Sequence, residues 1–422
     1  MLELQVLRTD ADRVRAGLEK KHFKEIHLVD ELLLVDEKRR KVQHQMEEVR
    51  AKENALAKEI GELFKQGKKE VAETRKLEAA SFKEESAKLT EQVSVLDDQQ
   101  FQLLVRFPNL PHASVPKGKT PEENEVVRES GAIPQLHEGA QPHWELAKKY
   151  DLFDLELGVK ITGAGFPVYK GKGAKLQRAL ISFFLDQAIA AGYNEVIPPH
   201  MVNEASGFGT GQLPDKEGQM YHAQLDNFYL IPTAEVPVTN IYRDEIIDER
   251  DLPKKNCAYS PCFRREAGSY GKDVRGLNRL HQFDKVEIVH ITTPEQSYAA
   301  LDSMVAHVES LLKQLELPYR ILRLCGGDMS FASALTYDFE VYSTAQQRWL
   351  EVSSVSNFET FQSNRMKLRV RGEDKKIRLA HTLNGSALAL PRIVAGLLEN
   401  HQTKDGIRIP AALVPYTGFD MI

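Results

Sequence analysis

The sequence predicts an α+β protein in which an N-terminal antiparallel two-helix coiled coil precedes an antiparallel sheet core flanked by helices. Three observations lead to this fold class. A seven-residue apolar repeat occupies the first hundred residues, a polar segment rich in Pro, Gly and Glu follows it, and strand-like runs then recur without a helix between each pair. We therefore expect a helical arm over residues 1–111, a linker over 112–141 and a globular domain over 142–422.

The helical arm is predicted from residues 28–103, which contain no proline and only two glycines. After a short amphipathic helix near residues 12–21, apolar side chains recur every seven residues, namely Leu28, Val35, Val42, Val49, Leu56 and Leu63. A second series follows at the same period, namely Phe82, Leu89, Leu96 and Leu103. Because the polar segment 66–69 separates the two series, the helices should fold back on each other as an antiparallel coiled coil.

Charge is distributed unevenly between the arm and the rest of the chain. Residues 37–83 hold thirteen Lys or Arg against nine Asp or Glu, whereas the whole chain of 422 residues carries a net charge of −5. A solvated coiled-coil surface explains such alternating charges without any partner. A surface that contacts a phosphate backbone explains them as well, with residues 38–41 as its densest cluster. The arm by itself fits a scaffold protein equally well.

Composition disfavours several classes of protein and of site. No apolar stretch approaches the ~18 residues that span a bilayer, and the N-terminus does not resemble a signal peptide, so we expect a cytoplasmic protein with no membrane partner. The three cysteines form no CxxC pair and the thirteen histidines show no HExxH spacing, which disfavours disulfides and zinc. No P-loop motif occurs, and no GxGxxG follows a strand, which disfavours the common nucleotide sites.

Chemistry is predicted in the C-terminal domain, on two strands joined by a glycine-containing loop. The first strand ends at residues 263–266, and the second runs from Arg279 through Glu287. Alternate residues of a strand share a face, so each strand gathers charged or aromatic side chains on one face: Arg264 and Glu266 on the first, and His281, Phe283, Lys285 and Glu287 on the second. The alternative is an amphipathic strand pair whose charges face solvent.

Two further polar segments follow apolar strands. Residues 233–235, with the sequence Thr-Ala-Glu, supply a hydroxyl and a carboxylate, or alternatively form the N-cap of a helix. Residues 351–354, with the sequence Glu-Val-Ser-Ser, offer oxygen ligands suited to Mg2+, or alternatively form a polar edge strand.

These segments together resemble the class II aminoacyl-tRNA synthetases, and among them the seryl-tRNA synthetases of bacterial type. Residues 192–199 resemble the dimer-forming motif 1, residues 263–287 resemble motif 2 with the run RGLNRLHQFDKVE, and residues 382–392 resemble motif 3. With the arm, the resemblance covers essentially the whole chain. It implies ATP-dependent activation of L-serine to seryl-adenylate and transfer to the 3′ end of tRNA(Ser), with tRNA(Sec) as an additional candidate. It also implies a homodimer and an arm that grips the tRNA.

The resemblance assigns a role to each site residue. The expected catalytic residues are Arg264 and Arg392. The expected serine-binding residues are Thr233, Ala234, Glu235, Glu287 and Ser386. The expected ATP-binding residues are Arg264, Arg265, Glu266, Leu280, Phe283, Glu351, Val352, Ser353, Ser354 and Arg392, and Mg2+ would be held by Glu351 and Ser354. The loop 268–278 would meet the acceptor end of the tRNA through Lys272, Arg275 and the neighbouring Arg279.

Three positions depart from the family pattern, namely Arg265, Ala387 and Pro391. None of them removes a charge that the chemistry needs, and Pro391 is compatible with a helix only in its first turn. Two rival functions are also considered. The intact arm disfavours a ligase that loads an amino acid on a carrier protein, and the retained site residues disfavour a structural or RNA-binding homologue without catalysis.

Overall fold

The computed structural model describes the whole chain except residue 216 and residues 267–274. It divides into two compact units, one comprising residues 1–19 and 23–108 and the other comprising residues 20–22 and 109–422. The helices of the N-terminal region are α1 (Leu4–Thr9), α2 (Ala11–Lys20), α3 (Leu28–Lys65) and α4 (Lys69–Leu104). These bounds confirm the predicted short helix and the two long helices that follow it.

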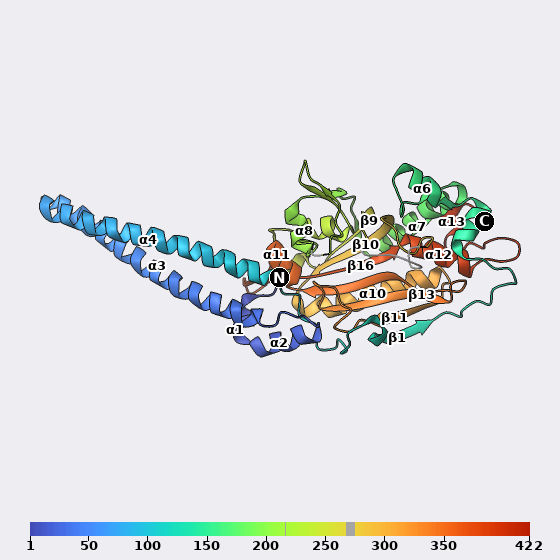
Figure 1. Cartoon of the computed structure of the whole chain (residues 1–422), viewed down its shortest axis with the longest axis horizontal. Coiled ribbons are helices and arrows are strands. Elements are labelled where there is room, and N and C mark those ends of the chain that lie inside the picture. The colour runs from blue at the N-terminus through green and yellow to red at the C-terminus, as the bar shows by residue number, and fades with distance from the viewer. Residues whose placement is uncertain (216, 267–274) are drawn as a thin grey trace. The chain divides into compact units, whose positions relative to one another are not determined.

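Helices α3 and α4 form the predicted antiparallel coiled coil, drawn in blue in Figure 1. Their contacts show that the two helices are antiparallel. Asp36, near the start of α3, contacts Gln100 near the end of α4, and Glu59, near the end of α3, contacts Arg75 near the start of α4. The predicted seam is buried or half-buried along both helices. At ~1.5 Å per residue, the 38 residues of α3 extend for about 57 Å.

One buried residue of the coiled coil is charged, and the apolar repeat did not predict it. Asp36 is 1% exposed and accepts hydrogen bonds from Arg8 (2.8 and 2.5 Å), Arg40 (3.1 Å) and Gln100 (3.0 Å). Burial on its own raises the pKa of Asp36, but the hydrogen bond and the positive charge of Arg8 outweigh it and hold that pKa below its usual value. Asp36 is therefore an ionised residue whose donors all lie within the helical unit.

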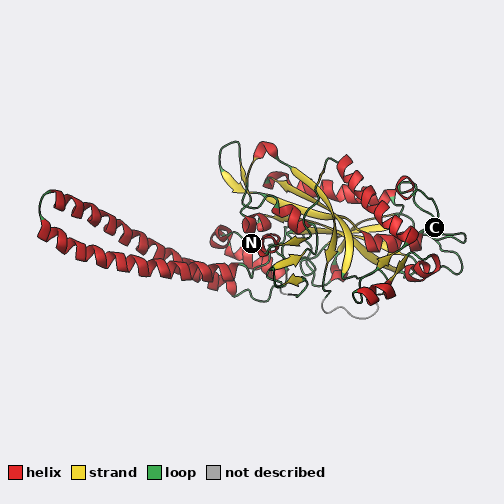
Figure 2. Ribbon diagram, turned by 90° about the horizontal axis from the view of Figure 1, so that it is seen from above, coloured by secondary structure: helices red, strands yellow, loops and turns green. Residues whose placement is uncertain are grey.

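The second unit is built on an eight-stranded sheet with the order β1-β11-β12-β13-β16-β10-β9-β4. Figure 2 shows the strands of this unit in yellow, with helices in red beside them. Neighbouring strands are antiparallel except β4 and β9, which are parallel. The strands in chain order are β1 (Glu125–Ser130), β4 (Asn194–Glu195), β9 (Lys254–Phe263), β10 (Gln282–Thr292), β11 (Tyr319–Arg323), β12 (Leu335–Ser343), β13 (Arg348–Glu359) and β16 (His381–Ala389). This sheet confirms the predicted α+β class.

Helices pack on the sheet, with α7 against β9 and β10, α10 against β13 and β16, and α12 against β12 and β13. The helices of this unit are α5 (His143–Tyr150), α6 (Leu155–Ile161), α7 (Gly171–Ala190), α8 (Glu204–Thr210), α9 (Glu235–Asn240), α10 (Ser297–Gln314), α11 (Phe361–Met366), α12 (Leu390–Asn400) and α13 (Val414–Thr417). The unit also contains the short 3-10 helices η1 (Pro121–Glu123), η2 (Glu249–Asp251) and η4 (Pro294–Gln296).

Three small sheets complete the unit. They are β2 (Phe153–Asp154) with β3 (Val168–Tyr169), β5 (Met201–Val202) with β7 (Phe228–Leu230) and β6 (His222–Ala223), and β15 (Ile377–Leu379) with β14 (Arg369–Arg371) and β8 (Ile246–Asp248). None of the helices in the described part of the chain combines the length and the apolar composition that a membrane crossing requires.

The segment 112–141, predicted as a linker, contains strand β1, which pairs with β11 at the edge of the main sheet. All six residues of β1 have exposed side chains. A strand that buries no side chain has no apolar alternation, so the sequence pattern could not distinguish it from a loop. The domain boundaries at 111 and 142 remain predictions.

A glycine and a proline stand at two helix ends where their backbone preferences fit. Helix α7 ends at Ala190, and Gly192 follows with a φ of +84°, a left-handed conformation that glycine adopts without strain. Pro391 is the second residue of α12, where its missing N–H costs no intrahelical hydrogen bond. The departure from the family pattern at position 391 is therefore accommodated by the fold.

Candidate active site

Arg264 and Phe283, predicted to bind ATP, lie together at the ends of β9 and β10. The Arg264 guanidinium lies over the Phe283 ring, 5.2 Å from its centroid, and the Arg264 Nε donates to the carbonyl oxygen of Pro232 at 3.4 Å. Phe283 pairs with Cys262 across the two strands. A cation and an aromatic ring are thus held next to the segment 233–235.

The next two motif 2 residues differ in their surroundings. Glu266 has a φ of +48° and forms an ion pair with Arg279 at 2.8 Å, so these two predicted site residues contact each other. Arg265 is exposed, and its backbone N–H donates to Gln219. Leu280, the residue after Arg279, is buried, with 4% of its surface exposed.

The loop between the motif 2 strands is described only in part. Lys272, expected to meet tRNA, lies outside the described residues. Arg275 is exposed, with its guanidinium 4.5 Å from the ring centroid of Trp144. At the end of the loop, the Leu277 N–H donates to His143 Nε2 at 2.8 Å. Because this nitrogen accepts, the His143 Nδ1 carries the proton and donates to Glu399 at 2.7 Å, in a neutral ring.

Four polar residues form a buried cluster next to the Arg264 contact with Pro232, namely Thr233, Glu235, Lys285 and Glu287. The Thr233 hydroxyl donates to Glu287 Oε2 at 3.0 Å, and the Lys285 Nζ lies 2.5 Å from the same oxygen. The Thr233 hydroxyl also accepts from the backbone N–H of Glu235 at 3.1 Å. The segment does begin helix α9, but its N-cap is Ala234, which makes no side-chain cap hydrogen bond. The Thr233 hydroxyl contacts Glu287 and lies in the candidate site. Lys285 and Glu287 do share one face of β10, as strand alternation predicted.

Glu235 is the carboxylate of this cluster with the most perturbed ionisation. Burial, and then the nearby Glu287 carboxylate, raise the pKa of Glu235 to about 7, although Gln362, Lys285 and Asn384 act in the opposite direction. Gln362 Nε2 donates to Glu235 Oε1 at 2.7 Å. A cationic ligand beside Glu235 would favour its charged form.

Residues 351–354 lie on β13, which has β12 and β16 on its two sides, so the edge-strand alternative is wrong. Arg392 connects this strand to the motif 2 loop. Its Nη1 donates to the Glu351 carbonyl at 2.7 Å and lies 3.8 Å from the Glu351 carboxylate, and its Nε donates to the Asn278 carbonyl at 2.9 Å. The Glu351 side chain is half exposed.

The two serines of this strand have different partners. The Ser354 hydroxyl donates to Asp338 at 2.6 Å across β12 and β13. Burial, and then the negative charge of Glu351, raise the pKa of Asp338 well above its usual range. The Ser353 hydroxyl donates to the backbone carbonyl of Ser386 at 2.6 Å. Among the other expected site residues, three are buried, namely Ala234, Val352 and Ser386.

Comparisons with known proteins agree with this arrangement. Residues 1–111 match the seryl-tRNA synthetase N-terminal domain, and residues 220–401 match the tRNA synthetase class II core domain (G, H, P, S and T). The chain is 53% identical over 424 residues to a serine–tRNA ligase of Salinibacter ruber, a match that covers 100% of this chain and 99% of that protein. This chain belongs to the seryl-tRNA synthetase family.

Further members of the family are similar over their full lengths. A serine–tRNA ligase of Chlorobium luteolum is 45% identical, with coverage of 100% of this chain and 99% of that protein. The crystal structure of seryl-tRNA synthetase from Pyrococcus horikoshii complexed with ATP superposes with a TM-score of 0.94 at 33% identity, and covers 100% of this chain and 99% of that one. The main sheet and the arm therefore follow the family fold.

Several residues around the synthetase site were not predicted as site residues. Lys285 was placed on the correct strand face, and its position two residues before Glu287 was a usable signal. Gln362 and His143 gave no such signal, because they reach their partners from elements 127 and 134 residues away in the chain. Asp338 lies on β12, which directly precedes β13, but no pattern marked it as a partner of Ser354. Only the folded chain brings them to the site.

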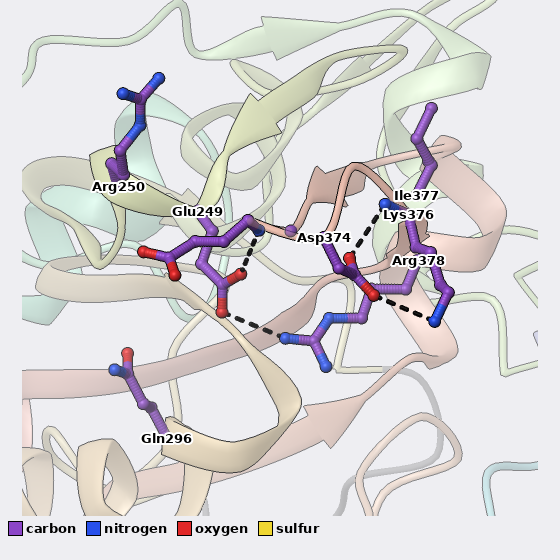
Figure 3. A pocket seen from close by; sticks show the side chains of 9 residues that line it. Glu249, Arg250, Gln296, Asp374, Lys376, Ile377 and Arg378 are labelled. Carbon is purple, nitrogen blue, oxygen red and sulfur yellow. Dashed lines mark hydrogen bonds and ion pairs between the residues drawn. The ribbon is translucent and has the colours of Figure 1, made fainter.

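A separate pocket of about 690 Å3 lies between η2, η4 and the β14–β15 hairpin (Figure 3). Its charged groups are largely paired with each other: Arg378 contacts Glu249 at 3.2 Å, and Lys376 contacts Asp374 at 3.1 Å. It shares no residue with the predicted synthetase site. The buried cluster and the strand ends around Arg264 remain the candidate active site.

Proposed function

We propose that this chain activates L-serine with ATP to form seryl-adenylate and pyrophosphate, and then transfers the seryl group to the 3′ end of tRNA(Ser). The observation that carries the proposal is the proximity of the Arg264–Phe283 pair to the buried cluster of Thr233, Glu235, Lys285 and Glu287. This proximity supports a nucleotide-binding surface next to a site for the ammonium group of a zwitterionic amino acid, both on one sheet.

ATP binding is assigned to the strand ends. Arg264 would bind the α-phosphate and stabilise the negative charge that develops as the serine carboxylate attacks it. Phe283 would stack on the adenine, with Leu280 near the ring. Glu266 would accept a hydrogen bond from the adenine amino group, and its carboxylate has a second oxygen for the ion pair with Arg279. Arg392 would hold the far side of the nucleotide.

Serine binding is assigned to the buried cluster. Glu235, Glu287 and Thr233 would hold the serine ammonium and hydroxyl, with Ser386 lining the side-chain pocket. Because the serine carboxylate is already ionised at pH 7, the attack needs no general base. Alignment of the two substrates then supplies much of the rate. A buried pocket built to bind a hydroxyl rejects alanine, since its polar groups would be left unpaired.

Mg2+ is assigned to Glu351 and Ser354. Carboxylate and hydroxyl oxygens suit this ion, which proteins usually hold through one or two side chains together with substrate phosphates. The half-exposed Glu351 fits a divalent cation here, and so does the neighbouring Asp338, whose pKa is raised by burial and then by the negative charge of Glu351. Bound with ATP, the ion would neutralise phosphate charge.

The arm is proposed to bind tRNA through shape and phosphate backbone, which suits its local excess of positive charge in a net-negative chain. We assign residues 1–111 to this arm, 112–141 to a connecting segment and 142–422 to catalysis. tRNA(Sec) is included as a second candidate substrate. Because charged tRNA is consumed by translation, we place the reaction in the cytoplasm.

A homodimer formed through the motif 1 region is part of the proposal. Three large apolar side chains are exposed between residues 189 and 201, namely Ile189, Ile197 and Met201, and Ile197 is 88% exposed. Neighbouring exposed apolar residues are typical of an interface. Sedimentation of the purified chain should give twice the mass of one chain.

The first experiment is pyrophosphate exchange into ATP with Mg2+ and each of the twenty amino acids. Exchange with serine alone, reduced about 100- to 1,000-fold by Arg264→Ala, is the expected result. If folded wild-type protein exchanges with no amino acid, the activation step is refuted and the non-catalytic homologue is favoured.

The role of the arm is tested by deleting residues 37–83. The deletion should preserve serine-dependent exchange and abolish charging of tRNA(Ser), with tRNA(Sec) assayed in parallel. A ligase for a carrier protein would retain its transfer step after this deletion.

A further inference from the structure

Gln362 is a fully buried amide that enters the proposed serine pocket from helix α11. It is 0% exposed, and α11 is the short helix that follows strand β13. The inference below rests on the proposed function, because it concerns how that pocket binds an amino acid. Nothing in the sequence pattern marked Gln362, since none of the strands that carry the motifs contains it.

The orientation of the Gln362 amide is fixed by two partners outside the pocket. The Thr210 backbone carbonyl can only accept, so the nitrogen 3.1 Å from it is Nε2. The Thr382 hydroxyl donates to Oε1 at 2.6 Å on the other side of the amide. Since an amide nitrogen has two N–H groups, the second one is left to donate to Glu235 Oε1 at 2.7 Å.

The polar groups that face Glu235 come from three elements, and only one of these elements contributes charged groups. Strand β10 contributes Glu287 and Lys285, which are paired with each other at 2.5 Å. Helix α11 contributes the neutral Gln362, and strand β16 contributes the neutral Asn384. Within the part of the chain that the structure describes, no cationic side chain forms an ion pair with Glu235. The two carboxylates and one ammonium leave one negative charge to be balanced by a ligand.

We propose that Gln362 is a positioning residue for amino-acid recognition, because its amide holds Glu235 as an oriented, ionised acceptor for the ammonium group of the bound substrate. Gln362 uses both of its N–H groups within the protein, and it therefore acts through Glu235 rather than on the substrate. Oε1 of Glu235 accepts from the Gln362 amide, and the proposal assigns the other carboxylate oxygen, Oε2, to the substrate ammonium.

The test compares two substitutions at this position by their Michaelis constants for serine and ATP in pyrophosphate exchange. Gln362→Met keeps a similar volume but removes the donor, which raises the pKa of Glu235 further. A hydrogen bond to a charged group contributes about 1.5–3 kcal/mol, so the serine KM should rise roughly 10- to 100-fold at pH 6.5 with the ATP KM unchanged. This penalty should shrink as the pH rises to 8.5 and Glu235 ionises.

Gln362→Glu should show the opposite pH trend. In acid its carboxyl is protonated and can still donate to Glu235, so the serine KM should be close to the wild-type value at pH 6.5. Above pH 8 that proton is lost and the two carboxylates repel each other, so the penalty should grow. A purely structural role of Gln362 would not give opposite trends for two substitutions at one position.

Gln402→Met provides a matched control. Gln402 is also buried, and its amide nitrogen donates to two backbone carbonyls, those of Gln141 and Glu399. The control loses a comparable buried amide outside the pocket, and both Michaelis constants should stay within twofold of wild type. If Gln362→Met does not fold, Thr382→Val, which frees Gln362 Oε1, should raise the serine KM about threefold.

The outcomes separate this inference from the function it rests on. Serine-dependent exchange by wild type, with an unchanged serine KM in folded Gln362→Met or with the same pH trend in both variants, overturns the role of Gln362 alone. An unchanged serine KM in Thr382→Val overturns it equally. Folded wild type that exchanges with no amino acid overturns the proposed function and the inference together.

Discussion

Two buried carboxylates, one in each unit, have opposite surroundings. Asp36 of α3 is 1% exposed, and the hydrogen bond and charge of Arg8 overcome its burial and keep its pKa below the usual value. Glu235 at the start of α9 is 8% exposed and faces Glu287, and its pKa is raised to about 7 despite the donor Gln362. Similar burial thus gives pKa shifts of opposite sign.

Under the proposed function, this difference separates a structural charge, Asp36, from a substrate-binding charge, Glu235. In the coiled coil, the donors of Asp36 belong to the same unit, so the charged form is stabilised by folding alone. At Glu235 the chain supplies the neutral amides of Gln362 and Asn384, and the only nearby ammonium in the described residues, that of Lys285, is paired with the competing carboxylate of Glu287. In the proposed function, the ammonium of the substrate would complete the counter-charge. Perturbed carboxylates of the second kind are typical of functional sites.

The largest effect is expected from removing the Lys285 ammonium, which is the partner of the buried Glu287 carboxylate. Lys285→Met leaves Glu287 buried without its cation, so the free energy of unfolding should fall by about 3–5 kcal/mol. Urea unfolding of the full chain measures this. Lys41→Met, which removes the partner of the exposed Glu37, is the control and should leave the midpoint unchanged. A loss below about 1 kcal/mol for Lys285→Met would show that the cluster does not need this charge.

Glu235→Gln should separate binding from stability. The value of kcat/KM for serine should fall roughly 100-fold, because the substrate ammonium loses its counter-charge. The free energy of unfolding at pH 8 should stay constant or increase, because a poorly stabilised buried charge is removed. Asp36→Asn, measured in the same way, should decrease it. Equal destabilisation by both variants would contradict the distinction between the two carboxylates.

Arg8→Met tests the supply of donors to Asp36. Asp36 would keep Arg40 and Gln100, and solvent screens part of the loss because Arg8 is 32% exposed, so a decrease of about 1–2 kcal/mol is expected. Hydrogen exchange of peptides from α3 and α4 in the full chain localises the effect. Arg15→Met, which breaks the exposed pair with Asp30, should leave this exchange unchanged.

The last expected effect is a pH dependence of stability that has opposite sign in the two units and amounts to at most about 1.4 kcal/mol per pH unit for each carboxylate. The pKa of Glu235 is raised in the folded state, so its contribution to stability is present at pH 4.5 and is lost as the pH rises to about 7. The pKa of Asp36 is lowered, so its contribution is present above about pH 4 and is lost as the pH falls further. Between pH 5 and 7 the core should therefore lose stability while the coiled coil stays constant. Asp338, whose pKa is also raised, contributes a slope of the same sign. A slope that Glu235→Gln does not reduce would therefore contradict the assignment.

The coiled coil shows how far periodicity alone can predict structure. A heptad repeat fixes which side of each helix is buried, and the polar segment 66–69 fixes where the chain turns, because both effects are local. The two long helices begin and end within a few residues of the predicted bounds. Asp36 escaped prediction because its donors Arg8 and Gln100 are 28 and 64 residues away.

The candidate site shows where such prediction ends. Strand alternation placed Lys285 and Glu287 on one face, and motif resemblance identified the residues around Arg264. Neither strand alternation nor motif resemblance predicted that Glu266 contacts Arg279, or that segment 112–141 adds strand β1 to the sheet. Ion pairs and edge strands depend on neighbours that have no fixed sequence spacing.

The sequence by itself determined the fold class, the helical arm, the family and most of the residues proposed for ATP and serine, because these follow from local periodicity and from contiguous motifs. Only the tertiary structure decided the ionisation of the site. Glu235 owes its raised pKa to burial and to Glu287, and its donor Gln362 lies 127 residues away in the chain. Burial and charge proximity are properties of the packed molecule, and no stretch of sequence contains them.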